Sequence, residues 1–134
     1  MGIPPRPELP VCRRAGSILL TLDPRGFVRA TSDPLAELTL TDAIASVEVV
    51  AELSGVRVPV LVDMTKVKSM SREAREYFGG AEAARSVSAV AIIIDGPVSR
   101  MLGTFFLRAN VKAMPHRLFS DEKSALEWLL GPME

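Results

Sequence analysis

Short apolar runs rich in β-branched residues alternate along the chain with segments whose apolar residues recur at helical spacing. The short runs predict strands at residues 17–22, 27–31, 59–63, 87–94 and 116–119. The helical segments begin after cap or turn residues near 41, 71, 97 and 120, and glycine or proline ends them near 55, 79–80, 115 and 131. The order ββαβαβαβα predicts an α/β fold, a mixed sheet flanked by amphipathic helices. Gly79-Gly80 is expected to weaken or break the second helix.

The first 14 residues differ in composition from the rest of the chain. They hold four of the ten prolines, which predicts an irregular arm over residues 1–14. Residues 15–134 are then predicted to form a single domain. A chain of 134 residues with 48% hydrophobic and 24% charged residues suits one such globular unit.

Charge and cysteine content narrow the classes of partner and location. Sixteen basic and sixteen acidic side chains cancel, so the chain lacks the positive charge that drives binding to nucleic acid, and no nucleic acid partner is expected. The single cysteine, Cys12, allows no internal disulfide, which suits a reducing compartment. The longest apolar run, residues 87–94, is far shorter than the ~20 residues of a membrane span. We expect a cytoplasmic protein without a transmembrane segment.

Residues that could carry catalysis or bind a metal are few. His116 is the only histidine, and the sequence has no Gly-x-Ser-x-Gly elbow for it to serve. Cys12 lies in the arm, a poor position for a nucleophile that must be held in register. One histidine and one cysteine form no ligand cluster, and Gly79-Gly80 lacks the lysine and Ser/Thr of a phosphate-binding loop. We therefore expect no catalytic residue, no metal, no cofactor and no enzyme activity.

The predicted third helix has a wide apolar face. Met101 and Leu102 are followed one turn later by Phe105 and Phe106, which places apolar side chains on adjacent rows. Burial in the core accounts for most of such a face. The alternative is that one edge, formed by these four residues, contacts a second copy of the chain or lines an apolar pocket.

Four segments of the chain carry a resemblance to a known family. The first runs from Pro59 to Ser71, a strand ending in Leu-Val-Asp and the connector after it. The others are Ser-Arg-Glu-Ala-Arg with an aromatic pair (residues 71–78), Pro-Val-Ser-Arg (97–100), and Leu-Phe-Ser-Asp-Glu leading to Ala-Leu-Glu-Trp-Leu (118–129). From about residue 17 to 130 the chain resembles STAS domains, and most closely a SpoIIAA-like branch of that superfamily.

The resemblance implies a regulatory, non-catalytic protein-interaction domain of bacterial type. In anti-sigma-factor antagonists of this superfamily, the loop after the third strand presents a phosphorylatable serine, and the phosphate disrupts docking of the partner. The acceptor position falls here on Arg72 or Glu73, so the sequence departs from that switch. Ser69 and Ser71 are the nearby hydroxyls that could accept phosphate, although Ser71 could equally serve only as the N-cap of the helix.

The polar connector at residues 64–70 and the helix after it supply the candidate partner-binding residues. Their side chains could form a basic edge that faces a partner, or a solvated surface without one. The candidates are Asp63, Lys66, Lys68, Ser69, Ser71, Arg72, Glu73 and Arg75. Asp63 ends a strand where open α/β sheets commonly bind ligands, but it could equally bond the amides of its own loop.

Three hypotheses about function follow. The first is a regulatory module that docks an unknown protein partner through residues 66–77. The second is a carrier of a small apolar ligand or lipid, because SpoIIAA-like domains resemble the lipid-exchanging CRAL-TRIO domains in fold and the helix at 98–109 could cover a cavity. The third is a structural subunit that self-associates as a homodimer through that helix.

Overall fold

The computed structural model describes residues 11–109 and 114–131, without the side chains of residue 103 and residues 105–109. Its strands are β1 (Val11–Ala15), β2 (Ile18–Asp23), β3 (Phe27–Ser32), β4 (Ala36–Leu38), β5 (Val58–Asp63), β6 (Val67–Met70), β7 (Val87–Ile93) and β8 (His116–Phe119). Its helices are α1 (Leu40–Ser54), α2 (Arg72–Phe78), α3 (Ala81–Ser86), α4 (Pro97–Ala109) and α5 (Glu122–Leu130). None of the helices within these ranges has the length and apolar character needed to cross a membrane.

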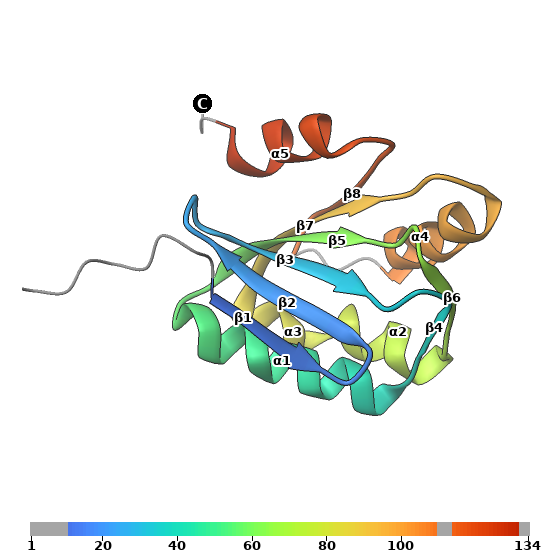
Figure 1. The fold of residues 1–134 in the computed structure, drawn as a ribbon, viewed down its shortest axis with the longest axis horizontal. Helices are drawn as coiled ribbons and strands as arrows, with labels where there is room; N and C mark the ends of the chain where they lie inside the picture. Colours follow the sequence, from blue (N-terminus) through green and yellow to red (C-terminus); the bar gives the residue numbers. More distant parts are fainter. Residues whose placement is uncertain (1–10, 110–113, 132–134) are drawn as a thin grey trace, which may run out of the picture.

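Six strands form one mixed sheet in the order β1-β2-β3-β5-β7-β8 (Figure 1). β1, β2 and β3 pair antiparallel, whereas β3, β5, β7 and β8 pair parallel. Helices join the parallel strands, because a tight turn cannot connect two strands that run the same way. β4 and β6 form a separate two-stranded parallel sheet at the end of the molecule where the parallel strands finish.

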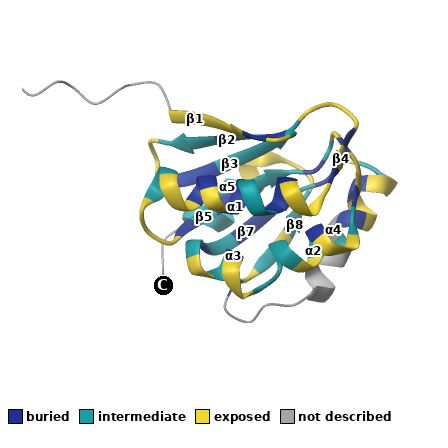
Figure 2. Cartoon of the chain, turned by 90° about the horizontal axis from the view of Figure 1, so that it is seen from below, coloured by how far each residue is buried: buried dark blue, intermediate teal, exposed yellow. Residues whose placement is uncertain are grey.

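Helices cover both faces of the large sheet (Figure 1). α1, α2 and α3 pack against one face, where the larger core lies, and α5 lies on the other. The smaller core under α5 consists of Phe27, Leu61, Ala91 and Ala125, each at most 1% exposed. Figure 2 shows buried positions along the central strands and exposed positions on the outward turns of the helices.

The helix ends follow signals in the local sequence. Thr39 caps α1 by accepting the backbone N–H of Asp42, whose carboxylate accepts the Thr39 N–H in return. Gly55 ends α1 with a φ of 72°, a left-handed conformation that glycine adopts without strain. The predicted break at Gly79-Gly80 is confirmed, since this pair separates α2 from α3.

Asp42 also ties the β1–β2 hairpin to α1. Its other carboxylate oxygen accepts the backbone N–H of Ser17 at 3.1 Å, and the residue is buried. Gly16 in the same turn has a φ of 61°, and a Cβ at this position would collide with the Asp42 carboxylate. Both the backbone conformation and the available space therefore demand glycine here.

The predicted α/β fold is confirmed, and two details differ from the sequence prediction. Residues 11–14, expected in an irregular arm, belong to β1, which pairs with β2 along its length; residues 1–10 of that arm lie outside the described residues. The expected connector at residues 64–70 contains β6, which pairs with an unpredicted strand, β4. β4 and β6 have only three and four residues, too few for an alternating pattern to reveal them.

Candidate functional site

The candidate partner-binding residues lie at the end of the molecule where the four parallel strands finish (Figure 1). β6 carries them away from the large sheet and α2 continues them, while β4 runs beside β6 and α4 packs against it. We call residues 66–73 of this segment the crest. Within it, the side chains open to solvent are Lys66, Lys68, Ser69, Arg72 and Glu73. Partners and ligands of open α/β sheets commonly bind at this end of the strands.

Two basic side chains of the crest form weak ion pairs with carboxylates of the same domain. Lys68 Nζ lies 3.4 Å from a carboxylate oxygen of Glu37 on β4, and Arg72 Nε lies 3.2 Å from one of Glu76. Such exposed pairs contribute about 0–1 kcal/mol each, so a partner could replace them at little cost. Lys66 forms no ion pair with any of the described residues.

Two of the predicted residues are engaged in shaping the local backbone. Asp63 Oδ1 accepts both the backbone N–H and the hydroxyl of Thr65, at 2.9 and 2.6 Å. Of the two interpretations of Asp63, the structure thus shows the bond within its own loop. Arg75 donates from Nη1 to the carbonyl of Met70 at 3.0 Å, which fixes the end of β6 against α2.

The two candidate phosphoacceptors differ in their surroundings. Ser71 is the N-cap of α2: its hydroxyl oxygen accepts the backbone N–H of Ala74 at 3.1 Å, and the residue is only partly exposed. Ser69 is exposed on β6. A modifying enzyme would therefore meet Ser69 more readily than Ser71.

Leu35, which was not among the predicted site residues, is the most exposed large apolar residue among those that the structure describes, at 74%. It follows Pro34 in a turn that the Ala36 N–H closes by donating to the Asp33 carbonyl at 3.1 Å. Its φ of 59° is left-handed, which costs a non-glycine residue roughly 1–2 kcal/mol. The Leu35 N–H donates to the Lys66 carbonyl at 2.9 Å, so Leu35 emerges beside the crest. Its signal in the sequence was a leucine at the turn position after proline that usually holds glycine or asparagine.

α4 adds exposed apolar surface next to β6. Val98 is 50% and Met101 is 53% exposed. Leu102 is only 3% exposed and belongs to the larger core, so it is not available to a second copy of the chain. This corrects the expectation that Leu102 contributes to a dimer surface. The side chains of Phe105 and Phe106 lie outside the described residues.

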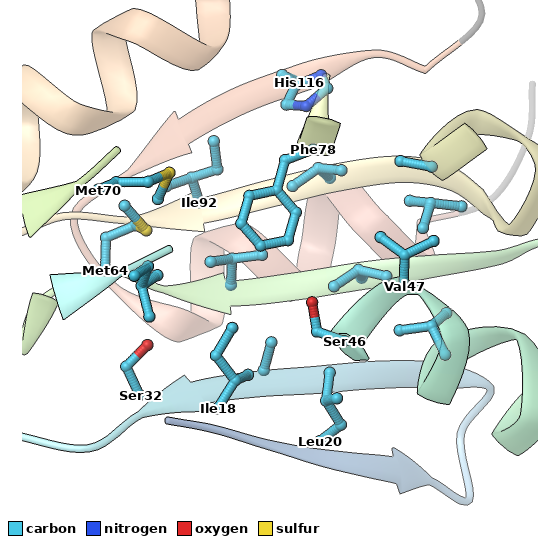
Figure 3. Close-up of a pocket in the computed structure, with 18 of the residues that line it drawn as sticks. Ile18, Leu20, Ser32, Ser46, Val47, Met64, Met70, Phe78, Ile92 and His116 are labelled. Atoms are coloured by element: carbon cyan, nitrogen blue, oxygen red, sulfur yellow. The ribbon is translucent and has the colours of Figure 1, made fainter. Parts of the chain in front are cut away.

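A cavity of about 80 Å³ lies between the large sheet and helices α1, α2 and α3. In Figure 3, Phe78 reaches into the space, Met64 and Met70 lie together at one end, and Ile18 and His116 lie on opposite sides. Apart from Ser32, Ser46 and His116, the described residues that line it are apolar. These are Ile18, Leu20, Ala30, Leu38, Val47, Val50, Val60, Val62, Met64, Met70, Phe78, Ala83, Val87, Val90, Ile92 and Met114. Met101 and Leu102 are not among the described lining residues, and the side chains of Phe105 and Phe106 lie outside the described part of the chain, so the expectation that α4 covers an apolar pocket stays a prediction.

The two reactive side chains weighed in the sequence lie apart. His116 Nδ1 lies 2.7 Å from the Met114 carbonyl, and burial lowers the pKa of the ring below its ordinary value, so it is neutral at pH 7. Cys12 is exposed on the edge strand β1, with its sulfur 3.3 Å from the Thr21 hydroxyl. Within residues 11–109 and 114–131 there is no group of three His, Cys, Asp or Glu side chains that could hold a metal ion.

A protein-family model matches residues 21–131, which is most of the chain. Its description is "Domain of unknown function (DUF7793)". The chain belongs to this family. No curated protein matches this DUF7793 chain.

The fold of this DUF7793 domain is SpoIIAA-like. It is similar to the crystal structure of an uncharacterised protein from Shewanella loihica PV-4, which is described as a DUF3478 family member with a SpoIIAA-like fold. The TM-score is 0.56 at 18% sequence identity, and the match covers 96% of this chain and 99% of the other. At this identity the similarity concerns the fold alone, and it confirms the architecture expected from the sequence.

Proposed function

We propose that this protein is a non-catalytic interaction module that docks a partner protein through the crest, with Leu35 as its apolar anchor. The observation that carries this is the state of Leu35, a large apolar side chain left 74% exposed on a backbone conformation that disfavours leucine. Leu35 combines an exposed apolar side chain with a left-handed backbone conformation, and both are unfavourable for leucine. Such a combination is typical of a functional site, because the fold alone gives no reason to keep it. The resemblance to regulatory STAS domains supports the same function.

The side chains around Leu35 indicate the chemistry of the partner. The Leu35 N–H donates to the Lys66 carbonyl, so Lys66 lies next to the leucine, and Lys68 follows two residues further along β6, where it pairs with Glu37. A matching partner surface is an apolar pocket with acidic side chains at its rim. Full burial of a leucine side chain contributes about 1.5–3 kcal/mol, so this anchor supports weak and reversible docking, which suits regulation.

Replacing Leu35 with asparagine separates docking from folding. Asparagine tolerates the left-handed conformation, so Leu35→Asn removes the apolar anchor while relieving the backbone. We expect the free energy of unfolding to stay the same or to rise by up to about 1 kcal/mol, whereas partner binding is lost. Val56→Asn is the matched control, since Val56 is 69% exposed in the loop between α1 and β5, where β5 begins rather than ends.

The readout is recovery of partners from native cells by the tagged wild type, Leu35→Asn, Lys66→Glu and Val56→Asn, quantified by mass spectrometry. A protein that is lost with Leu35→Asn and Lys66→Glu, and retained with Val56→Asn, supports docking through the crest. Recovery of the same proteins by all four baits would rule this surface out.

The other hypotheses receive less support from the geometry. Pockets for drug-sized ligands have volumes of roughly 300–1,000 Å³. The cavity here measures about 80 Å³, so we do not propose a lipid carrier. Self-association stays a prediction that light scattering after gel filtration tests, and the cytoplasmic location and the modification of Ser69 stay predictions as well.

A further inference from the structure

We propose that the core cavity is a binding site for a small uncharged apolar molecule. Its volume of about 80 Å³ is the first observation. Close-packed protein interiors contain few voids larger than a water molecule, which needs only roughly 10–15 Å³. A space several times that size, lined mainly by residues of the larger core, exceeds what ordinary packing leaves.

Among the described lining residues, only Ser32, Ser46 and His116 carry polar side chains, too few to hold a charged ligand or a cluster of water. The Ser46 hydroxyl donates to the carbonyl of Ala43 at 3.0 Å. His116 is bonded through Nδ1 to the Met114 carbonyl and is neutral because of its burial. A buried water needs two to four polar partners, and apolar cavities without them stay dry. The lining therefore selects an uncharged, apolar occupant.

The volume limits the size of the occupant. An apolar protein cavity of about 150 Å³ accepts benzene or xenon. The cavity here is roughly half as large, so in its present shape it admits an occupant smaller than benzene, such as a xenon atom or a short alkyl group.

The lining can also adapt to its occupant. Met64, Met70 and Met114 contribute to it, and each is at most 5% exposed. Methionine side chains are unbranched and flexible, and they fill irregular spaces in several conformations. Figure 3 shows Met64 and Met70 side by side at one end of the space, where their movement would lengthen it.

Xenon is a suitable probe because it is apolar, uncharged and spherical. Methyl-labelled protein is titrated with dissolved xenon, and the methyl resonances are followed by NMR. We expect saturable shifts for Val60 and Ile92, which line the cavity, and none for Val58, which lies on the same strand as Val60 outside the lining.

Matched variants complete the test. Val60→Ile places an additional methylene in the space and should weaken xenon binding about fourfold, the equivalent of one buried methylene, whereas Val58→Ile should leave it unchanged. Val90→Ile, also in the lining, serves as a second variant that should weaken binding. Shifts that grow linearly without saturation, that extend equally to Val58, or that are unaffected by Val60→Ile and Val90→Ile would overturn the proposed site.

Discussion

Two substitutions on one strand test whether the core of this protein contains real free space. Val58 and Val60 lie two residues apart on β5, so their side chains point to the same face of the sheet. They are 4% and 5% exposed, and both belong to the larger core. Only Val60 lines the cavity. Valine to isoleucine adds one methylene at either position and preserves the β-branched shape that strands favour.

The structure predicts opposite effects for the two variants. At about 24 cal/mol per Å³, an empty cavity of about 80 Å³ corresponds to about 2 kcal/mol of lost stability. A methylene that enters this space recovers up to about 0.8 kcal/mol, so Val60→Ile should be neutral or stabilising. Val58 is buried and is not among the residues that line the cavity, so the same group is expected to overpack the core there at a cost of about 1–3 kcal/mol. The two free energies of unfolding should therefore differ by about 1–4 kcal/mol.

Urea unfolding followed by circular dichroism measures this difference. The comparison is valid if both variants keep the wild-type m value, because a changed m value reports a change in the surface exposed on unfolding. If Val60→Ile loses as much stability as Val58→Ile, the lining around Val60 is fully packed. The free space, and the ligand site proposed in it, would then both be refuted.

Three further predictions concern the turn, the histidine and the helix cap. Gly16→Ala should destabilise the protein by more than about 1 kcal/mol in urea unfolding, since the new Cβ meets the Asp42 carboxylate and φ is positive; wild-type stability would contradict the hairpin geometry. Because burial lowers the pKa of His116, the unfolded chain binds the proton more readily, so stability is complete above about pH 6.5 and falls as the pH drops toward the lowered pKa. His116→Gln should reduce the fall in melting temperature between about pH 7.5 and 5.5. If the melting temperature of the variant falls with pH as steeply as that of the wild type, other groups cause the pH dependence. Ser71→Ala should cost about 1 kcal/mol while Ser71→Asp costs little, because aspartate also caps a helix; equal losses in urea unfolding would count against the cap.

The sequence predicted the elements whose signals are local. Gly55 and the Gly79-Gly80 pair marked helix ends, and Asp121 marked the start of α5, where it accepts the N–H of Ser124. β5 and β7 were recognised from their apolar runs, because strands covered on both faces are apolar throughout. The polar pattern after β5 also indicated an exposed segment, and Lys66, Lys68, Ser69, Arg72 and Glu73 are open to solvent, whereas partner binding there stays a prediction.

The features that the sequence did not reveal depend on contacts between distant segments. β4 and β6 are stabilised by pairing with each other across some thirty residues of chain, and neither has a pattern of its own. The exposure of Leu35 follows from that pairing, which fixes the turn before β4 beside Lys66. The cavity depends on how side chains from several strands and three helices meet, and no stretch of sequence encodes a volume.

The short strand β6 has residues buried in the core and residues exposed to solvent. Val67 and Met70 are buried, and Met70 lines the cavity, whereas Lys68 and Ser69 between them are open to solvent. If an occupant shifted the β6 backbone together with the Met70 side chain, it would alter the affinity of the crest, and thermodynamic reciprocity would require a docked protein to alter the affinity for that occupant by the same factor. β6 would then connect binding in the cavity with binding at the surface of the domain.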